Sequence, residues 1–135
     1  MTLLQAQLGL AGIFVICLSL QMAAVFYAGA KGKIKPNNQT KLLSKLLSVY
    51  AVHLAIIIGG IFSQQLDQSQ QISAAAFWFA LALAAIWNLL LMLRFISFTF
   101  SRDDSVTHLL TYITTIASAS SFLVAAAIAF FFTKR

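Results

Sequence analysis

Residues 72–100 have the sequence ISAAAFWFALALAAIWNLLLMLRFISFTF, in which Arg94 is the only charged residue and neither proline nor glycine occurs. As an α-helix this stretch would be about 43 Å long, at about 1.5 Å per residue. The hydrocarbon core of a bilayer is about 30 Å thick. A single apolar segment in lipid satisfies its backbone N–H and C=O groups only as a helix. The stretch therefore predicts a transmembrane helix that is long enough to tilt or to protrude.

The composition of the whole chain agrees with a membrane protein. Of the 135 residues, 61% are hydrophobic and 9% are charged, and the mean hydropathy is +0.91. Soluble domains carry about 25% charged residues. The length allows four spans with short loops and leaves no room for a separate soluble domain. We expect an all-α polytopic membrane protein, a four-transmembrane-helix bundle forming one domain over residues 1–135, with spans at about 8–28, 46–62, 72–100 and 108–132.

The basic residues predict how the spans are oriented. The loop after the first span holds five lysines and no acid, whereas Arg94 and Arg102 lie near the third loop and only Lys134 and Arg135 lie on the other side. The five lysines are Lys31, Lys33, Lys35, Lys41 and Lys45. Seven basic residues against two predict that loops 29–45 and 101–107 are cytoplasmic and that both termini are outside. Basic residues beside spans contact anionic lipid head groups, so membrane lipids are expected partners and nucleic acid is not.

Polar side chains lie toward the predicted cytoplasmic ends of the spans. The candidates for ligand binding are Gln21 on the first span, Tyr50 and His53 on the second, Arg94 on the third and Tyr112 on the fourth. Polar groups in lipid cost free energy unless they face protein or water. These residues predict a polar, cationic cavity suited to an anionic or amphipathic ligand. The alternative is a set of interfacial residues and helix–helix hydrogen bonds, which every such bundle has.

Arg94 and His53 each have two interpretations. Arg94 shares a helix face with Ala80, Ala84 and Trp87, so it would end a packed seam between helices. Alternatively, its side chain snorkels to lipid phosphates. His53 would be a haem or metal ligand, but no second ligand lies at helical spacing. We therefore favour a hydrogen-bonded packing role for His53 and expect no metal site.

The fourth span carries a stripe of small, weakly polar residues, namely Thr111, Thr114, Ser118, Ser121 and Ala125. Such a stripe is typical of helix packing, and a pore lining is the alternative. No Asp or Glu lies within a predicted span, which disfavours proton-coupled transport of the usual carboxylate type. The sequence also contains no Gly-rich phosphate loop and no Cys/His metal motif.

The layout resembles the MAPEG family, the membrane-associated proteins in eicosanoid and glutathione metabolism. The shared plan has four spans, a basic loop such as residues 30–36 (AKGKIKP), a short second loop, and an aromatic run (residues 86–88, IWN) that leads to Arg94. The resemblance implies a left-handed bundle that trimerises and binds glutathione in its cytoplasmic half between subunits. Members with transferase activity have Arg, Asn and Glu on span two, where this chain has Lys45, Val49 and His53. The Tyr that usually follows the span-three arginine is also replaced, by Phe98 or another apolar residue, so only Arg94 carries over.

Three functional hypotheses follow. The first is a divergent MAPEG-like protein that binds a thiol or lipophilic anion, with Arg94 holding the anionic group and Tyr50 or Tyr112 donating a hydrogen bond. The second is a non-catalytic accessory subunit of a larger membrane complex, and the third is a small channel or carrier. The expected protein partners are further copies of the chain or other membrane subunits. Whether the protein is an enzyme stays open at this point.

Overall fold

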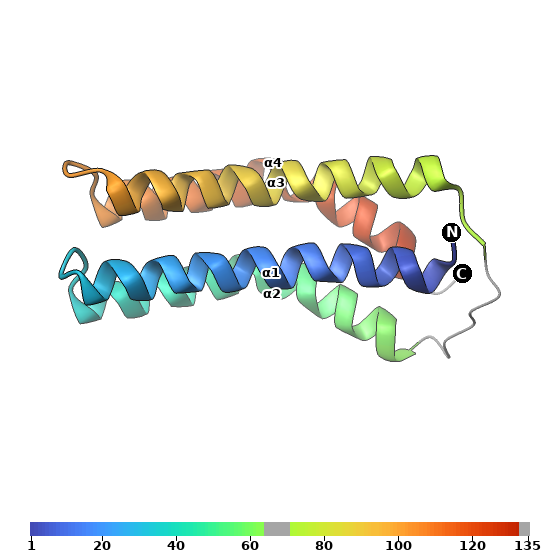
Figure 1. Ribbon diagram of the computed structural model, residues 1–135, viewed down its shortest axis with the longest axis horizontal. Coiled ribbons are helices and arrows are strands. Elements are labelled where there is room, and N and C mark those ends of the chain that lie inside the picture. Colours follow the sequence, from blue (N-terminus) through green and yellow to red (C-terminus); the bar gives the residue numbers. More distant parts are fainter. Residues whose placement is uncertain (64–70, 133–135) are drawn as a thin grey trace.

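The computed structural model describes residues 1–63 and 71–132, and its described part is helical apart from turns and one isolated bridge between Thr2 and Gln71. The four helices are α1 (Leu3–Ala30), α2 (Pro36–Ser63), α3 (Ala74–Phe100) and α4 (Val106–Phe132), shown in Figure 1. They confirm the prediction of an all-helical fold. Asp67, Lys134 and Arg135 lie outside the described residues.

Three of the helices, α1, α2 and α3, are long and apolar enough to cross a membrane. The fourth, α4, bends by 52° between Val106–Phe122 and Val124–Phe132, and it joins the other three when its two parts are counted as one span. Three to four apolar helices of this kind are consistent with an integral membrane protein.

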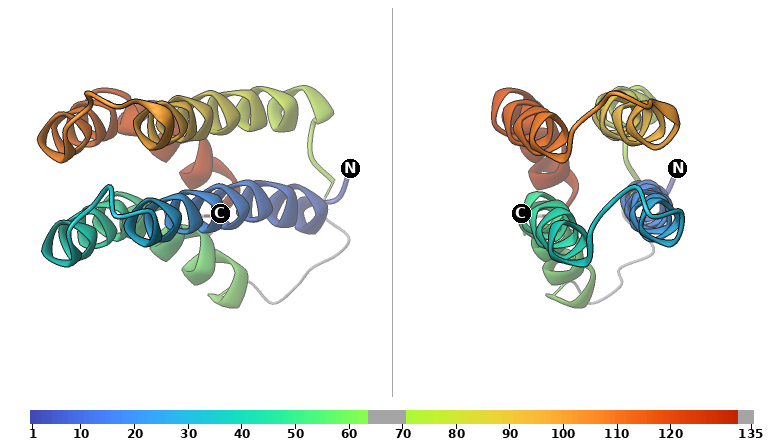
Figure 2. Two further views of the ribbon diagram at one scale, coloured as in Figure 1. Left: turned by 60° about the vertical axis from the view of Figure 1, so that its left-hand side comes forward. Right: turned by 90° about the vertical axis from the view of Figure 1, so that its left-hand side faces the viewer.

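The chain forms two helical hairpins, α1–α2 and α3–α4, which lie side by side. Both hairpin turns, residues 31–35 and 101–105, lie at one end of the bundle, and the N-terminus lies at the other (Figure 1). Viewed end-on in Figure 2, the helices occupy four corners, with α1 next to α2 and α3, and with α4 next to the same two helices. The two loops predicted to be cytoplasmic therefore share one end of the molecule, while the side of the membrane on which they lie stays a prediction.

Local sequence explains where the helices begin. The Thr2 hydroxyl accepts a hydrogen bond from the Gln5 N–H, and the Gln5 side chain accepts one from the Thr2 N–H, which is a capping box. Pro36 begins α2, where its missing N–H costs no helical hydrogen bond. The Ser105 hydroxyl accepts from the His108 N–H at 3.2 Å and caps α4.

The second helix is longer than the predicted span. It begins at Pro36, whereas the span was expected to begin near residue 46, so much of the expected 29–45 loop is helical. Leu42 and Leu46, one turn apart, are both fully buried, while Lys41 between Leu42 and Pro36 is exposed. This first part of α2 is amphipathic. A hydropathy limit marks the edge of the apolar segment and does not mark the end of the helix.

Small residues allow the helices to pack closely. Ala80, Ala84 and Trp87, which share the face predicted to form a packed seam on α3, are all buried. At the end of the bundle away from the hairpin turns, a Cβ atom placed on Gly60 would lie only 2.6 Å from Phe132 Cβ. The backbones of α2 and α4 therefore approach each other at a distance that only glycine permits.

Candidate functional site

A buried relay of hydrogen bonds joins α1, α2 and α3 near the middle of the bundle. Asn88 Nδ2 donates to the Ala84 carbonyl oxygen at 2.8 Å, and the Tyr50 hydroxyl donates to Asn88 Oδ1 at 2.6 Å. Gln21 Nε2 in turn donates to the Tyr50 oxygen at 2.7 Å. None of the three side chains is more than 1% exposed. Because the single Tyr50 proton is used toward Asn88, the Tyr50 oxygen must accept from Gln21, and the relay has one direction.

Aromatic side chains surround this relay. The Trp87 ring lies 5.2 Å from the Tyr50 ring and 4.8 Å from the His53 ring, measured between centroids. Phe14 of α1 stacks on His53 with a centroid separation of 5.6 Å. The Ser121 hydroxyl of α4 lies 3.4 Å from His53 Nε2. All four helices therefore contribute a side chain to this cluster. Packed side chains therefore make up the centre of the bundle around the relay.

His53 has polar neighbours for both ring nitrogens. Its Nδ1 lies 3.3 Å from the Val49 carbonyl oxygen, and its Nε2 lies 3.4 Å from the Ser121 hydroxyl. No group of three or more His, Cys, Asp or Glu residues in the described part of the chain could hold a metal ion. This geometry supports the interpretation of His53 as a hydrogen-bonded packing residue.

Arg94 lies in a second polar layer, closer to the hairpin turns. Its guanidinium binds both carboxylate oxygens of Asp104, one of them at 2.9 Å, and its Cζ lies 5.6 Å from the centroid of the Tyr112 ring. This hydrogen bonding lowers the pKa of the Asp104 carboxyl below its ordinary value. The Arg94 charge is therefore balanced within the chain. Sequence reasoning missed Asp104 as a partner of Arg94, although the short turn 101–105 was a signal that could bring it back to α3.

Lys33 is a second cation with an internal partner. Its ammonium group donates to the carbonyl oxygens of Phe98 and Ser101 at the C-terminal end of α3. It also lies 4.4 Å from the centroid of the Phe98 ring. The last carbonyls of a helix have no partner within the helix, and a cation there is favoured by the helix dipole. Lys33 thus binds one hairpin to the other.

The five predicted ligand-binding residues fall into two groups. Gln21 and Tyr50 are bonded to each other, and His53 lies beside them around Trp87. Arg94 and Tyr112 lie together in the layer near the turns. Six residues separate Asn88 from Arg94 along α3, which is about 9 Å. The residues were expected to line one cavity, but the longer α2 places Tyr50 and His53 deeper than the predicted span implied.

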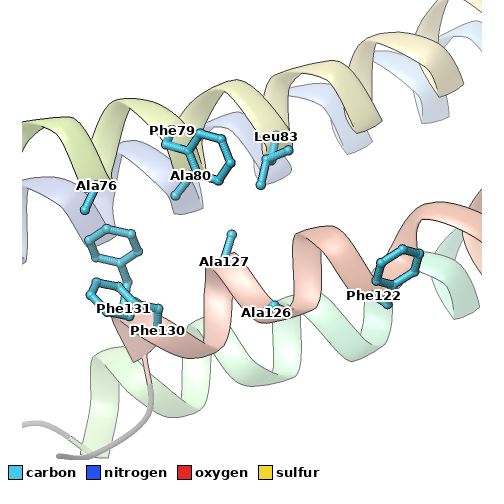
Figure 3. A pocket seen from close by; sticks show the side chains of 9 residues that line it. All are labelled: Ala76, Phe79, Ala80, Leu83, Phe122, Ala126, Ala127, Phe130 and Phe131. Atoms are coloured by element: carbon cyan, nitrogen blue, oxygen red, sulfur yellow. The ribbon is translucent and has the colours of Figure 1, made fainter.

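An apolar groove lies between α3 and α4 (Figure 3), and its lining residues are in the parts of both helices far along the chain from the turn 101–105. Its volume is about 410 Å³, and all of its lining side chains are apolar. They are Ala76, Phe79, Ala80, Leu83, Phe122, Ala126, Ala127, Phe130 and Phe131. The lining residues of α4 lie on both sides of its bend. Sequence reasoning missed this groove because neither proline nor glycine marks the bend.

The hydroxyl stripe of α4 lies on the outside of the bundle. Thr111, Thr114 and Ser118 are exposed, and each hydroxyl donates to the carbonyl oxygen four residues earlier in the same helix. Ser121 departs from the stripe, since its hydroxyl lies against His53. The stripe faces away from the other three helices, so any helix that it packs against belongs to another molecule.

Comparisons of the chain with protein-family models, curated proteins and solved structures find no match. The resemblance to the MAPEG family, with the trimer and the glutathione site that it implies, stays a prediction.

Proposed function

We propose that this protein is a four-span integral membrane protein that binds the apolar chain of a membrane-dissolved molecule in the groove between α3 and α4. The groove carries the proposal. It has an entirely apolar lining, and its volume of about 410 Å³ falls within the range of about 300–1,000 Å³ of ligand pockets. A molecule dissolved in the bilayer can enter it sideways, between two helices, without crossing water.

The shape of the groove favours a single alkyl or isoprenoid chain over a protein helix. Four of its lining residues are alanines, Ala76, Ala80, Ala126 and Ala127. Phe79 and Phe122 on either side are about two-thirds exposed, at 68% and 66%. Small residues with bulky rings beside them leave a narrow space. A second helix needs an axis separation of about 8–10 Å and an open face instead.

The sequence led us to expect a thiol or a lipophilic anion as the ligand. This proposal retains only the lipophilic character of that ligand. Arg94 was the expected anchor of the anionic group, and an anion bound there would compete with the Asp104 carboxylate. Arg94 also lies near the C-terminal end of α3, whereas the groove is lined by the first turns of this helix. The proposal therefore does not depend on a negative charge of the ligand, nor on any chemical reaction at the site.

A photoreactive alkyl probe in lipid vesicles tests this function. We expect cross-links to concentrate on groove residues such as Phe79 and Phe122, and to be lost when Ala126→Leu or Ala127→Leu fills the space. Ala85→Leu is the matched control, because Ala85 is an exposed alanine of α3 that does not line the groove. Cross-links spread evenly over the lipid-facing residues, and unchanged in Ala126→Leu, would contradict the proposal.

A second function, that of a non-catalytic subunit in a larger membrane complex, is supported by the hydroxyl stripe of α4. Membrane helices associate through small and weakly polar residues, and Thr111, Thr114 and Ser118 present such residues outward. Native mass spectrometry of the protein released gently from its own membrane tests this alternative. Recovery of the chain alone, or of a homo-oligomer without other proteins, would count against it. A channel through the bundle finds least support, because Thr111, Thr114 and Ser118, its supposed lining, are on the outside, and Trp87 packs against Tyr50 inside.

A further inference from the structure

The buried relay ends in an acceptor without a donor. Asn88 is oriented by its bond to the Ala84 carbonyl, and Tyr50 must therefore accept from the Gln21 amide nitrogen. This fixes the Gln21 amide, so turning it over would break the bond to Tyr50. Within the described residues, Gln21 Oε1 has no hydrogen-bond partner.

The second polar atom without a partner is a donor on a ring that packs against Tyr50. Trp87 Nε1 is buried and also has no partner among the described residues. The Trp87 ring packs against the ring of Tyr50, and Tyr50 is bonded to Gln21. One unpaired donor and one unpaired acceptor therefore flank the same tyrosine. Two unpaired polar groups in a buried core cost free energy, and the surrounding lipid offers them no hydrogen bonds.

We propose that the centre of the bundle binds one hydroxyl group, which accepts a hydrogen bond from Trp87 Nε1–H and donates one to Gln21 Oε1. A hydroxyl is the smallest group that carries both a donor and an acceptor. Water and the end group of a lipophilic alcohol share this chemistry. The inference is independent of the α3–α4 groove, since both of its atoms belong to the central relay.

Indole N–H signals of the ¹⁵N-labelled full-length protein in lipid nanodiscs test the proposal. The chain has two tryptophans, and Trp78 is 61% exposed, so its indole serves as an internal control. We expect a nuclear Overhauser contact between the Trp87 indole proton and water. If an alcohol is the occupant, added 1-decanol replaces the water contact with a contact to its own protons, whereas decane has no effect.

Two variants test the role of Gln21. Gln21→Met removes the acceptor, and the occupancy seen at Trp87 should fall by about tenfold, as expected for the loss of one of two hydrogen bonds. Ser19→Ala is the control, because Ser19 is exposed and its hydroxyl donates to the Val15 carbonyl within α1. The proposal is wrong if the Trp87 indole of the unaltered protein contacts neither water nor decanol. This includes the case in which Trp87 donates directly to Gln21. The contacts of the Trp87 indole in the unaltered protein therefore test the proposal even if Gln21→Met does not fold.

Discussion

The Lys33 ammonium group lies 4.4 Å from the centroid of the Phe98 ring and donates a hydrogen bond to the carbonyl oxygen of the same residue. Lys33 belongs to the turn of the α1–α2 hairpin, and Phe98 belongs to the last turn of α3. One side chain therefore connects the two hairpins at the end where both turns lie. This contact gives the basic first loop a structural role in addition to the topological role that its charge predicts.

Replacement of Lys33 by methionine should destabilise the protein. Lys33→Met keeps an unbranched side chain of similar length but removes the donor to the last carbonyls of α3, which should cost about 1 kcal/mol. The free energy of unfolding in bicelles measures the loss, and hydrogen exchange should show faster exchange at the end of α3. Lys35→Met changes an exposed lysine of the same turn and is the control. Equal effects of the two substitutions would show that only the loop charge matters.

The central relay predicts a large effect from the loss of one oxygen atom. Tyr50→Phe leaves the Gln21 amide N–H and Asn88 Oδ1 without their buried partner. Each such group costs about 1–3 kcal/mol, so we expect a destabilisation of about 2 kcal/mol or more. Tyr27→Phe is the control, because Tyr27 is 51% exposed at the end of α1. The same unfolding measurement compares the two variants, and a loss at Tyr50 no greater than at Tyr27 would contradict the relay.

Much of the fold follows from the sequence, because period and hydropathy act within one helix. The α3 seam of Ala80, Ala84 and Trp87 was predictable from helical spacing. The role of Ser105 as the cap of α4 was predictable from its position before an apolar run. The relay joins three helices, so it depends on the relative depth of the helices. Depth was misjudged for Tyr50, since the helix begins at Pro36 and the hydropathy of its first turns is low.

The site was less predictable than the fold for two further physical reasons. Arg94 was expected to hold an anionic ligand or to reach lipid phosphates, and its partner Asp104 was missed because only the closure of the hairpin brings the two together. The groove depends on the bend of α4, which has no proline or glycine to signal it. Contacts between elements decide both features, and a pattern within one element does not contain them.

The Arg94–Asp104 pair predicts a dependence of stability on pH. The folded pKa of Asp104 is lower than its ordinary value of 3.8, so the carboxylate contributes stability above that value. This stability is lost as the pH falls from about 4 through the lower folded pKa. Unfolding free energies measured from about pH 6 to about pH 3 should fall more steeply for the unaltered protein than for Asp104→Asn.

Two controls separate this ion pair from its surroundings. Asp103→Asn removes the exposed neighbouring carboxylate and should leave the slope unchanged. His108 must also be considered, because its Nδ1 lies 4.0 Å from Asp104 Oδ1. His108→Gln should retain the loss below about pH 4, since Arg94 remains in place. A slope that follows His108 and not Asp104 would assign the pH dependence to the histidine.

The adjacent glycines of α2 should respond in opposite directions to the same substitution. A Cβ atom at Gly60 would lie 2.6 Å from Phe132 Cβ and 2.7 Å from the Phe132 carbonyl oxygen, so Gly60→Ala must push α2 and α4 apart. Overpacking of this kind costs about 1–3 kcal/mol. At Gly59 a Cβ meets no described atom within 4 Å, so Gly59→Ala should gain up to about 1 kcal/mol from helix propensity. Unfolding free energies of the two variants in the same bicelles test the contrast. Equal values would mean that α2 and α4 do not approach each other closely at this point.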